Sequence, residues 1–388
     1  MLQLFEALFN GISVGSVLLM AALGLAIVFG LMGVINLAHG ELMMLGAYTT
    51  FVVQNCFKAF GEAWFNYYIF VALFFAFTVA ALAGLALEKG VIRYLYGRPL
   101  ETLLATWGVS LILQQLVRSI NGVLTISILI FCFLFFGALW SLRRRTSASV
   151  VKSGTKSILF LLAFAIAVVL GILLGNLGQQ ALTKPWFSAR NVDVTAPAWL
   201  RGGLPIGTFQ LPYSRIFIIV LTIICVVGIY LFFNRSRWGL RIRAVTQNRS
   251  MSACLGIPTE QVDALTFAIG SGLAGIAGCA ISLLGSVGPN TGQNYIVDTF
   301  MVVVVGGVGN LLGTIIAAIA IGILNYLIGS GTLALILSPV QALQPVTDFF
   351  TFFATTSMAK VMIFALIITF LQIKPAGIFP PKGRTAEL

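Results

Sequence analysis

Charged residues are scarce in this sequence. Asp, Glu, Lys and Arg make up 9% of its 388 residues, whereas hydrophobic residues make up 59%. A soluble domain needs polar side chains over its surface, so this balance excludes an ordinary soluble protein and indicates a chain that lies in a lipid bilayer. The sequence has one histidine, and its five cysteines form no C-x-x-C pair. We therefore expect neither a metal site nor a disulfide framework.

Nucleotide-binding and leader motifs are also missing. No G-x-x-x-x-G-K-[ST] loop occurs, and Ser-Gly-Thr-Lys-Ser at 153–157 is too short and lacks the Gly-Lys step. We therefore expect no ATP site, no cofactor and no catalytic residue in this chain, so active transport would take its energy from a partner or an ion gradient. The start of the sequence lacks the positive region of a signal peptide, and the apolar run after it is long enough to remain as the first span.

Long apolar stretches separated by short polar breaks fill most of the sequence. About 20 helical residues cross the hydrocarbon core of a bilayer. We predict an all-α polytopic transmembrane bundle, a single domain over residues 1–388. It has about eleven spans, at 8–32, 41–57, 67–88, 101–118, 124–141, 158–177, 214–233, 263–286, 295–310, 311–329 and 358–373. The longest gaps, 178–213, 234–262 and 330–357, are too short for a separate core.

The basic residues predict the orientation of the chain, which has a formal net charge of +12. Cytoplasmic loops are enriched in Lys and Arg. With the amino terminus outside and the carboxyl terminus inside, sixteen of the 23 basic residues lie on the inner side and seven on the outer side. Because these charges are spread over several short loops, we expect no nucleic-acid partner.

Two places depart from plain spanning helices. Between the first two spans, polar groups and a glycine are predicted to turn the chain at the inner face, with the carboxylate opening the next helix at its positive dipole end: Asn36, His39, Gly40 and Glu41. The segment 295–310 is short for a crossing and indicates a broken or re-entrant helix. Its end contains Gly306, Gly307, Gly309 and Asn310.

The loop 234–262 is the longest one predicted to be cytoplasmic. Its five arginines alternate with apolar residues, which indicates an interfacial helix or an amphipathic loop on anionic lipid. Gly256, Ile257 and Pro258 would end that helix, and Thr259 would begin the next. The segment 330–357 is expected to lie along the outer surface.

A polar row marks the span 101–118. Four polar residues recur every four positions, which places them in one slanting lane on a helix, with Trp107 near it: Thr102, Thr106, Ser110 and Gln114. In lipid such a lane must face protein or water. It either lines a path for a small polar solute, or its hydroxyls bond their own backbone while the amide joins helices.

Three patterns suggest other functions. The glycines of 270–275 match G-x-G-x-x-G, but they lie within an apolar span and favour helix packing over dinucleotide binding. Residues 11–15 fit G-x-S-x-G, so Ser13 and His39 would form the dyad of an intramembrane protease, although Gly11 and Gly15 also fit a packing pair. Asp298 is either the mid-membrane carboxylate of a gradient-driven carrier or a boundary residue satisfied by its neighbours.

The segment 34–48, Val-Ile-Asn-Leu-Ala-His-Gly-Glu-Leu-Met-Met-Leu-Gly-Ala-Tyr, resembles the signature of membrane permease subunits of bacterial branched-chain amino-acid-type ABC importers. Residues 101–108 and 302–313 resemble the same family, and 49–55 and 191–197 are most similar to its urea importer branch. The resemblance covers about 1–122 and 190–388.

The resemblance implies a complex in the bacterial inner membrane. A second related permease subunit completes a heterodimer, two ATPase subunits hold ATP and Mg, and a periplasmic protein delivers the solute. Urea is the expected solute, with branched-chain amino acids or short amides as the alternative. The cytoplasmic loop 234–262 would be the coupling loop. Within 244–258, the residues that match the coupling pattern are Ala253, Gly256 and Ile257. Arg243 and Ala244 are further coupling candidates.

An insert at 123–189 departs from the family pattern. It holds two apolar runs around Arg143, Arg144 and Arg145. A pair of added spans leaves both flanks on their original sides and places the three arginines inside. We expect peripheral helices that contact lipid.

Overall fold

The computed structural model describes residues 2–145, 153–176, 186–187, 190–206, 209–337 and 344–379. It divides into two compact units, the first formed by residues 1–111 and 192–388 and the second by residues 112–191. The second unit contains the whole predicted insert. The helix α5 (Pro99–Ser119) contributes to both units.

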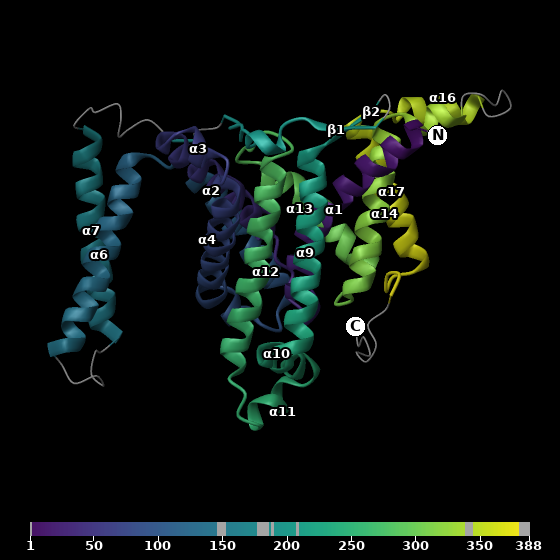
Figure 1. Ribbon diagram of the computed structural model, residues 1–388. Coiled ribbons are helices and arrows are strands. Elements are labelled where there is room, and N and C mark those ends of the chain that lie inside the picture. The colour runs from purple at the N-terminus through teal and green to yellow at the C-terminus, as the bar shows by residue number, and fades with distance from the viewer. Residues whose placement is uncertain are drawn as a thin grey trace. The chain divides into compact units, whose positions relative to one another are not determined.

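The first unit is a bundle of helices (Figure 1). Its amino-terminal elements are α1 (Leu2–Met32), α2 (His39–Phe60), α3 (Glu62–Phe65), α4 (Tyr68–Gly90), the short 3-10 helix η1 (Ile92–Leu95) and the first part of α5. After the second unit follow η2 (Ala198–Leu200), β1 (Gly203–Ile206), β2 (Phe209–Pro212), α9 (Tyr213–Arg235), α10 (Arg237–Gln247) and α11 (Arg249–Cys254). The last elements are α12 (Thr259–Ser282), α13 (Thr291–Gly306), α14 (Leu311–Gly329), α15 (Thr332–Leu337), α16 (Gln344–Phe352) and α17 (Thr356–Ile373).

Helices α1 and α12 form the centre of this unit. Both are apolar and mostly buried, and α1 packs on α14, α12 and α9 while α12 packs on α4 and α2. Glycines make these contacts close. A Cβ on Gly15 would lie 3.0 Å from the Ile319 Cα, and a Cβ on Gly278 would lie 2.8 Å from the Met43 carbonyl carbon. Small residues let helix backbones meet in this way, which is the usual packing inside membranes.

The predicted polytopic helical bundle is confirmed. Seven described helices are long and apolar enough to cross a membrane: α1, α4, α5, α7, α9, α12 and α14. Two shorter apolar helices coincide with α6 and α17. The remaining two predicted spans correspond to α2, which is rich in polar residues, and to α13, which has 16 residues.

The two ends of the first unit differ. The start of α1, the helix α16 and the strands β1 and β2 lie at one end, whereas α10 and α11 lie at the other (Figure 1). The strands form an antiparallel hairpin in which Gly203 pairs with Pro212 and Ile206 with Phe209. This hairpin adds two short strands that the all-α prediction omits, because four-residue strands carry almost no periodic signal. The segment 330–357, predicted to lie along a surface, contains α15 and α16.

The second unit contains two long helices, α6 (Gly122–Arg145) and α7 (Ser153–Asn176). They pair through aromatic rings, with the Phe131 and Phe160 centroids 5.4 Å apart and those of Phe135 and Phe160 5.8 Å apart. Two helices therefore occupy part of the predicted insert 123–189. The three arginines end α6, and residues 146–152 lie outside the described part of the chain.

Candidate functional site

The chain re-enters the bundle after α1. The His39 Nε2 atom lies 3.0 Å from the carbonyl oxygen of Ala21, which precedes the end of α1 at Met32 by eleven residues. At 1.5 Å of rise per residue, α2 therefore begins about 16 Å inside the end of α1. The predicted helix-break residues therefore lie beside the middle of α1 and not at its end. The segment 33–38 instead runs back alongside α1, starting at Gly33, whose φ of 67° favours glycine.

The re-entrant segment 33–38 obtains its hydrogen bonds from the protein. The Ala38 N–H donates to Asn36 Oδ1 at 3.1 Å, and the Leu37 N–H donates to Thr106 Oγ1 at 3.2 Å. Asn36 and Ala38 are buried. Because non-helical backbone within a membrane protein needs such partners, α5 is the element that makes the re-entrant conformation possible.

The first turn of α2, directly after the segment 33–38, contains the buried carboxylate of Glu41. Ser110 Oγ donates a hydrogen bond of 3.0 Å to Glu41 Oε1, and both residues are almost fully buried. Glu41 lies in the first turn of α2, where the helix dipole favours an anion. A Cβ on Gly292, in the first turn of α13, would lie 2.9 Å from Glu41 Cδ and 2.6 Å from the Gly40 oxygen. The amino-terminal turns of two helices therefore meet at this carboxylate, a feature that the sequence did not indicate.

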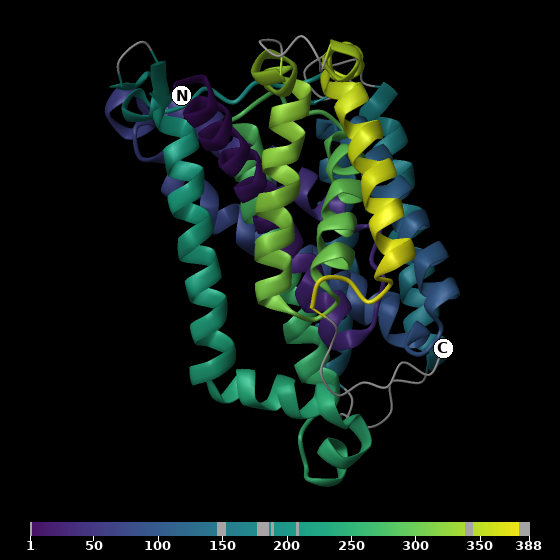
Figure 2. The same ribbon diagram turned by 90° about the vertical axis from the view of Figure 1, so that its right-hand side faces the viewer.

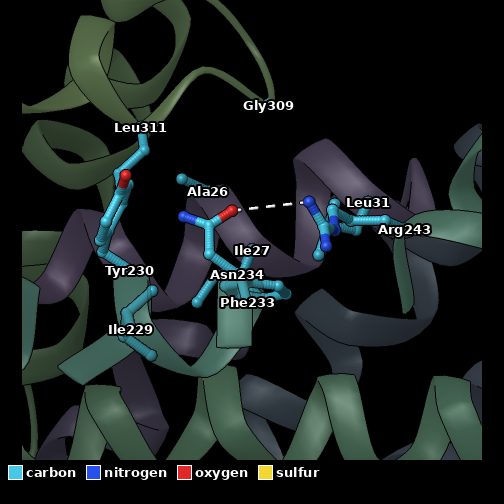
Figure 3. A pocket seen from close by; sticks show the side chains of 10 residues that line it. All are labelled: Ala26, Ile27, Leu31, Ile229, Tyr230, Phe233, Asn234, Arg243, Gly309 and Leu311. Atoms are coloured by element: carbon cyan, nitrogen blue, oxygen red, sulfur yellow. Dashed lines mark hydrogen bonds between the residues drawn. The ribbon is translucent and has the colours of Figure 1, made fainter. Parts of the chain in front are cut away.

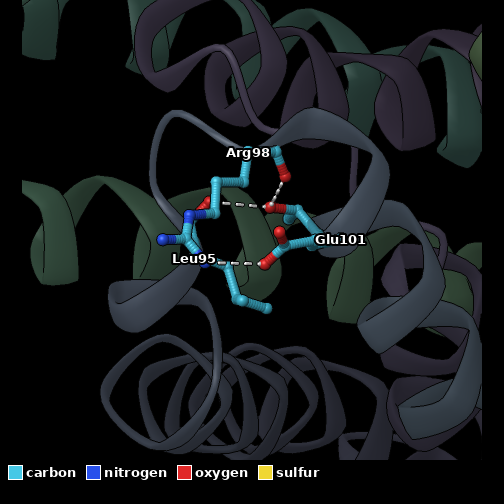
Figure 4. Close-up of polar contacts among 4 residues, drawn as sticks. Leu95, Arg98 and Glu101 are labelled. Carbon is cyan, nitrogen blue, oxygen red and sulfur yellow. Dashed lines mark hydrogen bonds and ion pairs between the residues drawn. The ribbon is translucent and has the colours of Figure 1, made fainter.

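The polar lane of α5 faces inward. Thr102, Thr106, Ser110 and Gln114 are all buried, Gln114 being in the part of α5 that belongs to the second unit. Thr102 Oγ1 donates to the carbonyl oxygens of Leu95 at 3.0 Å and Arg98 at 2.9 Å, beside the exposed ion pair of Arg98 with Glu101 (Figure 4). Trp107 is 49% exposed, so the structure does not bring it to the lane. One residue along a helix is a turn of about 100°, which separates it from Thr106.

The second helix break is a tight turn between α13 and α14. Gly307 and Gly309 have φ values of 99° and 83°. Asn310 caps α14 by accepting hydrogen bonds from the Leu312 and Gly313 N–H groups at 3.1 and 3.3 Å. Gly306 packs against Gly313, so these glycines allow the two helices to approach. The segment 295–310 therefore belongs to one helix and the turn that follows it.

The loop 234–262 contains two helices. Ser236 caps α10 through the Gly239 N–H at 2.9 Å, and Asn248 caps α11 through the Met251 N–H at 3.0 Å. The break at Asn248 was not predicted. The predicted stop is present, because α11 ends before Gly256, which has a φ of 78°, and α12 begins at Thr259. Of the coupling candidates, Arg243 and Ala244 lie on α10, Ala253 lies on α11, and Gly256 and Ile257 lie in the turn that follows.

Helix α11 forms the tip of the first unit (Figure 2). Met251 and Leu255 expose 59% and 76% of their surface there. The unit therefore ends in two exposed apolar side chains.

An ionic cluster fixes this tip to the bundle. Arg249 Nη2 lies 2.6 Å from Asp263 Oδ2, and the Arg249 guanidinium lies 5.1 Å from the centre of the Tyr96 ring. The Tyr96 hydroxyl donates to Glu88 Oε1 at 3.5 Å. Burial raises the pKa of Tyr96, and the neighbouring Asp263 and Glu88 raise it further, so this hydroxyl stays a donor. Arg93 also pairs with Glu260 at the start of α12.

The structure also places the residues of the alternative functions. His39 Nε2 bonds Ala21, not Ser13, and the glycines that flank Ser13 pack against α14. The G-x-G-x-x-G glycines lie within α12, where Gly270 meets Gly24. Both patterns therefore serve packing.

Asp298 is ion-paired. Its Oδ2 atom lies 2.8 Å from Lys360 Nζ, which also donates to the Asn294 carbonyl oxygen at 3.4 Å. A carboxylate with such partners fits a boundary residue better than the proton- or ion-binding group of a carrier. Within the described residues, no group of three His, Cys, Asp or Glu side chains could hold a metal ion.

Comparison with known proteins identifies a matching protein family. The model described as "Branched-chain amino acid transport system / permease component" matches residues 7–371. The high-affinity branched-chain amino acid transport system permease protein LivH of Escherichia coli is 25% identical over 383 residues, 97% of this chain and 96% of the relative. BraD of Pseudomonas aeruginosa, with the same description, is 25% identical over 82% of this chain and 84% of its own length. The ribose import permease protein RbsC of E. coli is 25% identical over 55% of this chain and 75% of its own length. No solved structure matches.

Proposed function

Because the chain belongs to the permease-component family of the branched-chain amino acid transport system, we propose that it is the membrane-spanning subunit of a bacterial ABC importer for branched-chain amino acids. The relatives that match nearly its whole length support this solute. They favour the alternative stated above over urea, which rested on two short segments, 49–55 and 191–197. The energy would come from ATP bound with Mg by partner subunits.

One observation carries the choice of an amino acid. Glu41 lies where the first turns of α2 and α13 meet, as the contacts of Gly40 and Gly292 show. Helix amino termini attract the carboxylate of a solute, and a side-chain carboxylate attracts its ammonium group. Discontinuous helices in transporters bind amino-acid solutes in this manner. An uncharged solute such as urea would need neither feature.

We infer the partner subunits from the family and from the position of α11 at the tip of the first unit. A second permease subunit would complete the path, a periplasmic binding protein would dock at the end that holds α16 and the hairpin, and two ATPase subunits would dock at α11. Closure of the ATPase would push α11, and the Arg249–Asp263 pair would pass that movement to α12. Helix α12 contacts α1 beside His39, since a Cβ on Gly24 would lie 2.8 Å from His39 Cε1. The force would thus reach the start of α2.

Uptake by the complete complex tests this function. Proteoliposomes with the chain, its partner subunits and enclosed ATP should accumulate labelled leucine in the presence of the binding protein, and labelled urea should stay at the level of empty liposomes. Accumulation of urea without leucine would reverse the choice of solute. Uptake that persists without ATPase subunits would indicate a gradient-driven carrier or channel.

A further inference from the structure

An apolar groove opens beside α10. It is a cavity of about 340 Å³ between α1, α9 and the start of α14 (Figure 3). Its walls include Ile27, Leu31, Ile229, Phe233 and Leu311. These helices are predicted spans, and α10 lies at the end of the unit opposite the hairpin. An open apolar groove at this place faces lipid unless a protein covers it.

Polar side chains also line the groove. Arg243 of α10 and Asn234 near the end of α9 line it, with Arg243 Nη1 3.5 Å from Asn234 Oδ1 (Figure 3). Arg243 is exposed, and within the described part of the chain no carboxylate lies within ion-pair distance of it. A guanidinium that is accessible and without a counter-ion can bind an anionic group through two N–H donors.

The protein surface around Arg243 is also positively charged. Arg235, Arg237 and Arg241 are exposed close to Arg243 in sequence, and α10 contains no acidic residue. The opposite face of α10 is apolar, because Ile242 and Val245 are buried in a cluster with Val262. The Arg241 guanidinium lies 4.9 Å from the centre of the Trp238 ring. Exposed arginines beside the ends of membrane spans are typical of the cytoplasmic side of a membrane.

We propose that this groove binds one anionic phospholipid of the inner leaflet, with an acyl chain along Ile27, Ile229 and Phe233 and the phosphate at Arg243 and Asn234. The apolar walls match a hydrocarbon chain, and the uncompensated arginine matches its headgroup. A free phosphate would leave the apolar walls uncovered. The lipid would hold α10 at the membrane surface, leaving α11 to contact the ATPase.

Lipid retention by the purified full complex tests the site independently of transport. The complex is equilibrated with phosphatidylglycerol or phosphatidylcholine, washed with excess inorganic phosphate and examined by native mass spectrometry. The wild type should retain phosphatidylglycerol in preference to phosphatidylcholine. Arg243→Gln should lower that retention about fivefold, since one arginine near the surface contributes about that factor. Arg243→Lys should largely restore it.

The matched control is Arg237→Gln, which removes an exposed arginine of the same helix that does not line the groove. It should change retention by less than twofold. Equal losses in Arg237→Gln and Arg243→Gln would show a diffuse basic surface and overturn the site. A crosslink to the second permease subunit from a photoreactive maleimide attached at Tyr230→Cys, formed in high yield in the assembled complex, would show that protein covers the groove and would also overturn it. Neither result bears on the solute, because no uptake is measured.

Discussion

The hydroxyl of Ser110 donates a 3.0 Å hydrogen bond to the carboxylate of Glu41, and this contact joins the polar lane of α5 to the first turn of α2. It brings together a residue from the predicted solute path and one from the predicted helix break. The two predictions therefore describe one site, at which the re-entrant segment 33–38 and the start of α2 are held by α5.

The first prediction concerns Glu41. Glu41→Gln keeps the shape of the side chain but removes its charge, so an ammonium-bearing solute loses its partner. We expect uptake of labelled leucine to fall at least tenfold, about 1.4 kcal/mol. Ser110→Ala should lower it less, because the carboxylate keeps its charge and loses only one hydrogen bond. The amount of assembled complex and its ATPase activity are the controls. Normal leucine uptake by Glu41→Gln would reject the proposed role of this carboxylate.

The second prediction concerns the close contact of α1 with α12. A Cβ on Gly24 would collide with the Gly270 carbonyl oxygen and with His39 Cε1, so Gly24→Ala should separate the helices and displace His39. We expect a lower thermal unfolding temperature and a loss of uptake. Gly228→Ala is the matched control, since its Cβ would meet nothing within 4 Å and alanine is the better helix former. A Gly24→Ala complex as stable as the control would contradict the packing described here.

The third prediction concerns the pair of Arg249 with Asp263. The Asp263 side chain is 5% exposed, whereas that of Arg249 is 49% exposed. Arg249→Gln leaves a buried carboxylate without its counter-ion, so it should destabilise the complex more than Asp263→Asn does. The half-exposed arginine keeps the cost below the roughly 3–5 kcal/mol of a fully buried pair.

Both variants should also lower the amount of leucine transported per ATP hydrolysed. In the double variant this ratio should be no lower than in Arg249→Gln alone, because both changes remove the same interaction. The measurement is ATPase activity and uptake in the same proteoliposomes. If the ratio of transport to hydrolysis stays unchanged in all three variants, the pair serves stability alone.

The fourth prediction concerns orientation. Cys56 near the end of α2 and Cys254 at the end of α11 are both exposed, and they lie toward opposite ends of the first unit. In intact bacteria a membrane-impermeant maleimide should label Cys56, and it should reach Cys254 only after the membrane is permeabilised. Cys56→Ser and Cys254→Ser identify the two signals. Labelling of Cys254 in intact cells would reverse the proposed topology.

The sequence predicted the helices well because long apolar runs carry a strong signal. It also placed the start of α12 at Thr259, since Gly256 and Pro258 end one helix before the next begins. The depth at which α2 begins was not predictable. That depth depends on contacts of His39 with Ala21 and of Gly40 with Gly292, which join parts of the chain that no local pattern relates.

Only part of the candidate site was predictable, namely the part that a local pattern in the sequence fixes. The four-residue spacing of Thr102, Thr106 and Ser110 placed them on one helix face, and the structure buries all three. Their partners could not be derived from spacing, because they lie on other elements. The pair of Arg249 with Asp263 was missed since it forms across the turn that separates α11 from α12.

The glycine contact between α1 and α12 has a mechanical consequence. Gly270 lies eleven residues after the start of α12, so the contact with Gly24 stands about 16 Å along that helix, near its middle. Backbones that touch without interlocking side chains form a pivot. A rotation of α12 about this pivot carries its two ends in opposite directions, so a push on α11 at one end moves the far end of α12 the opposite way.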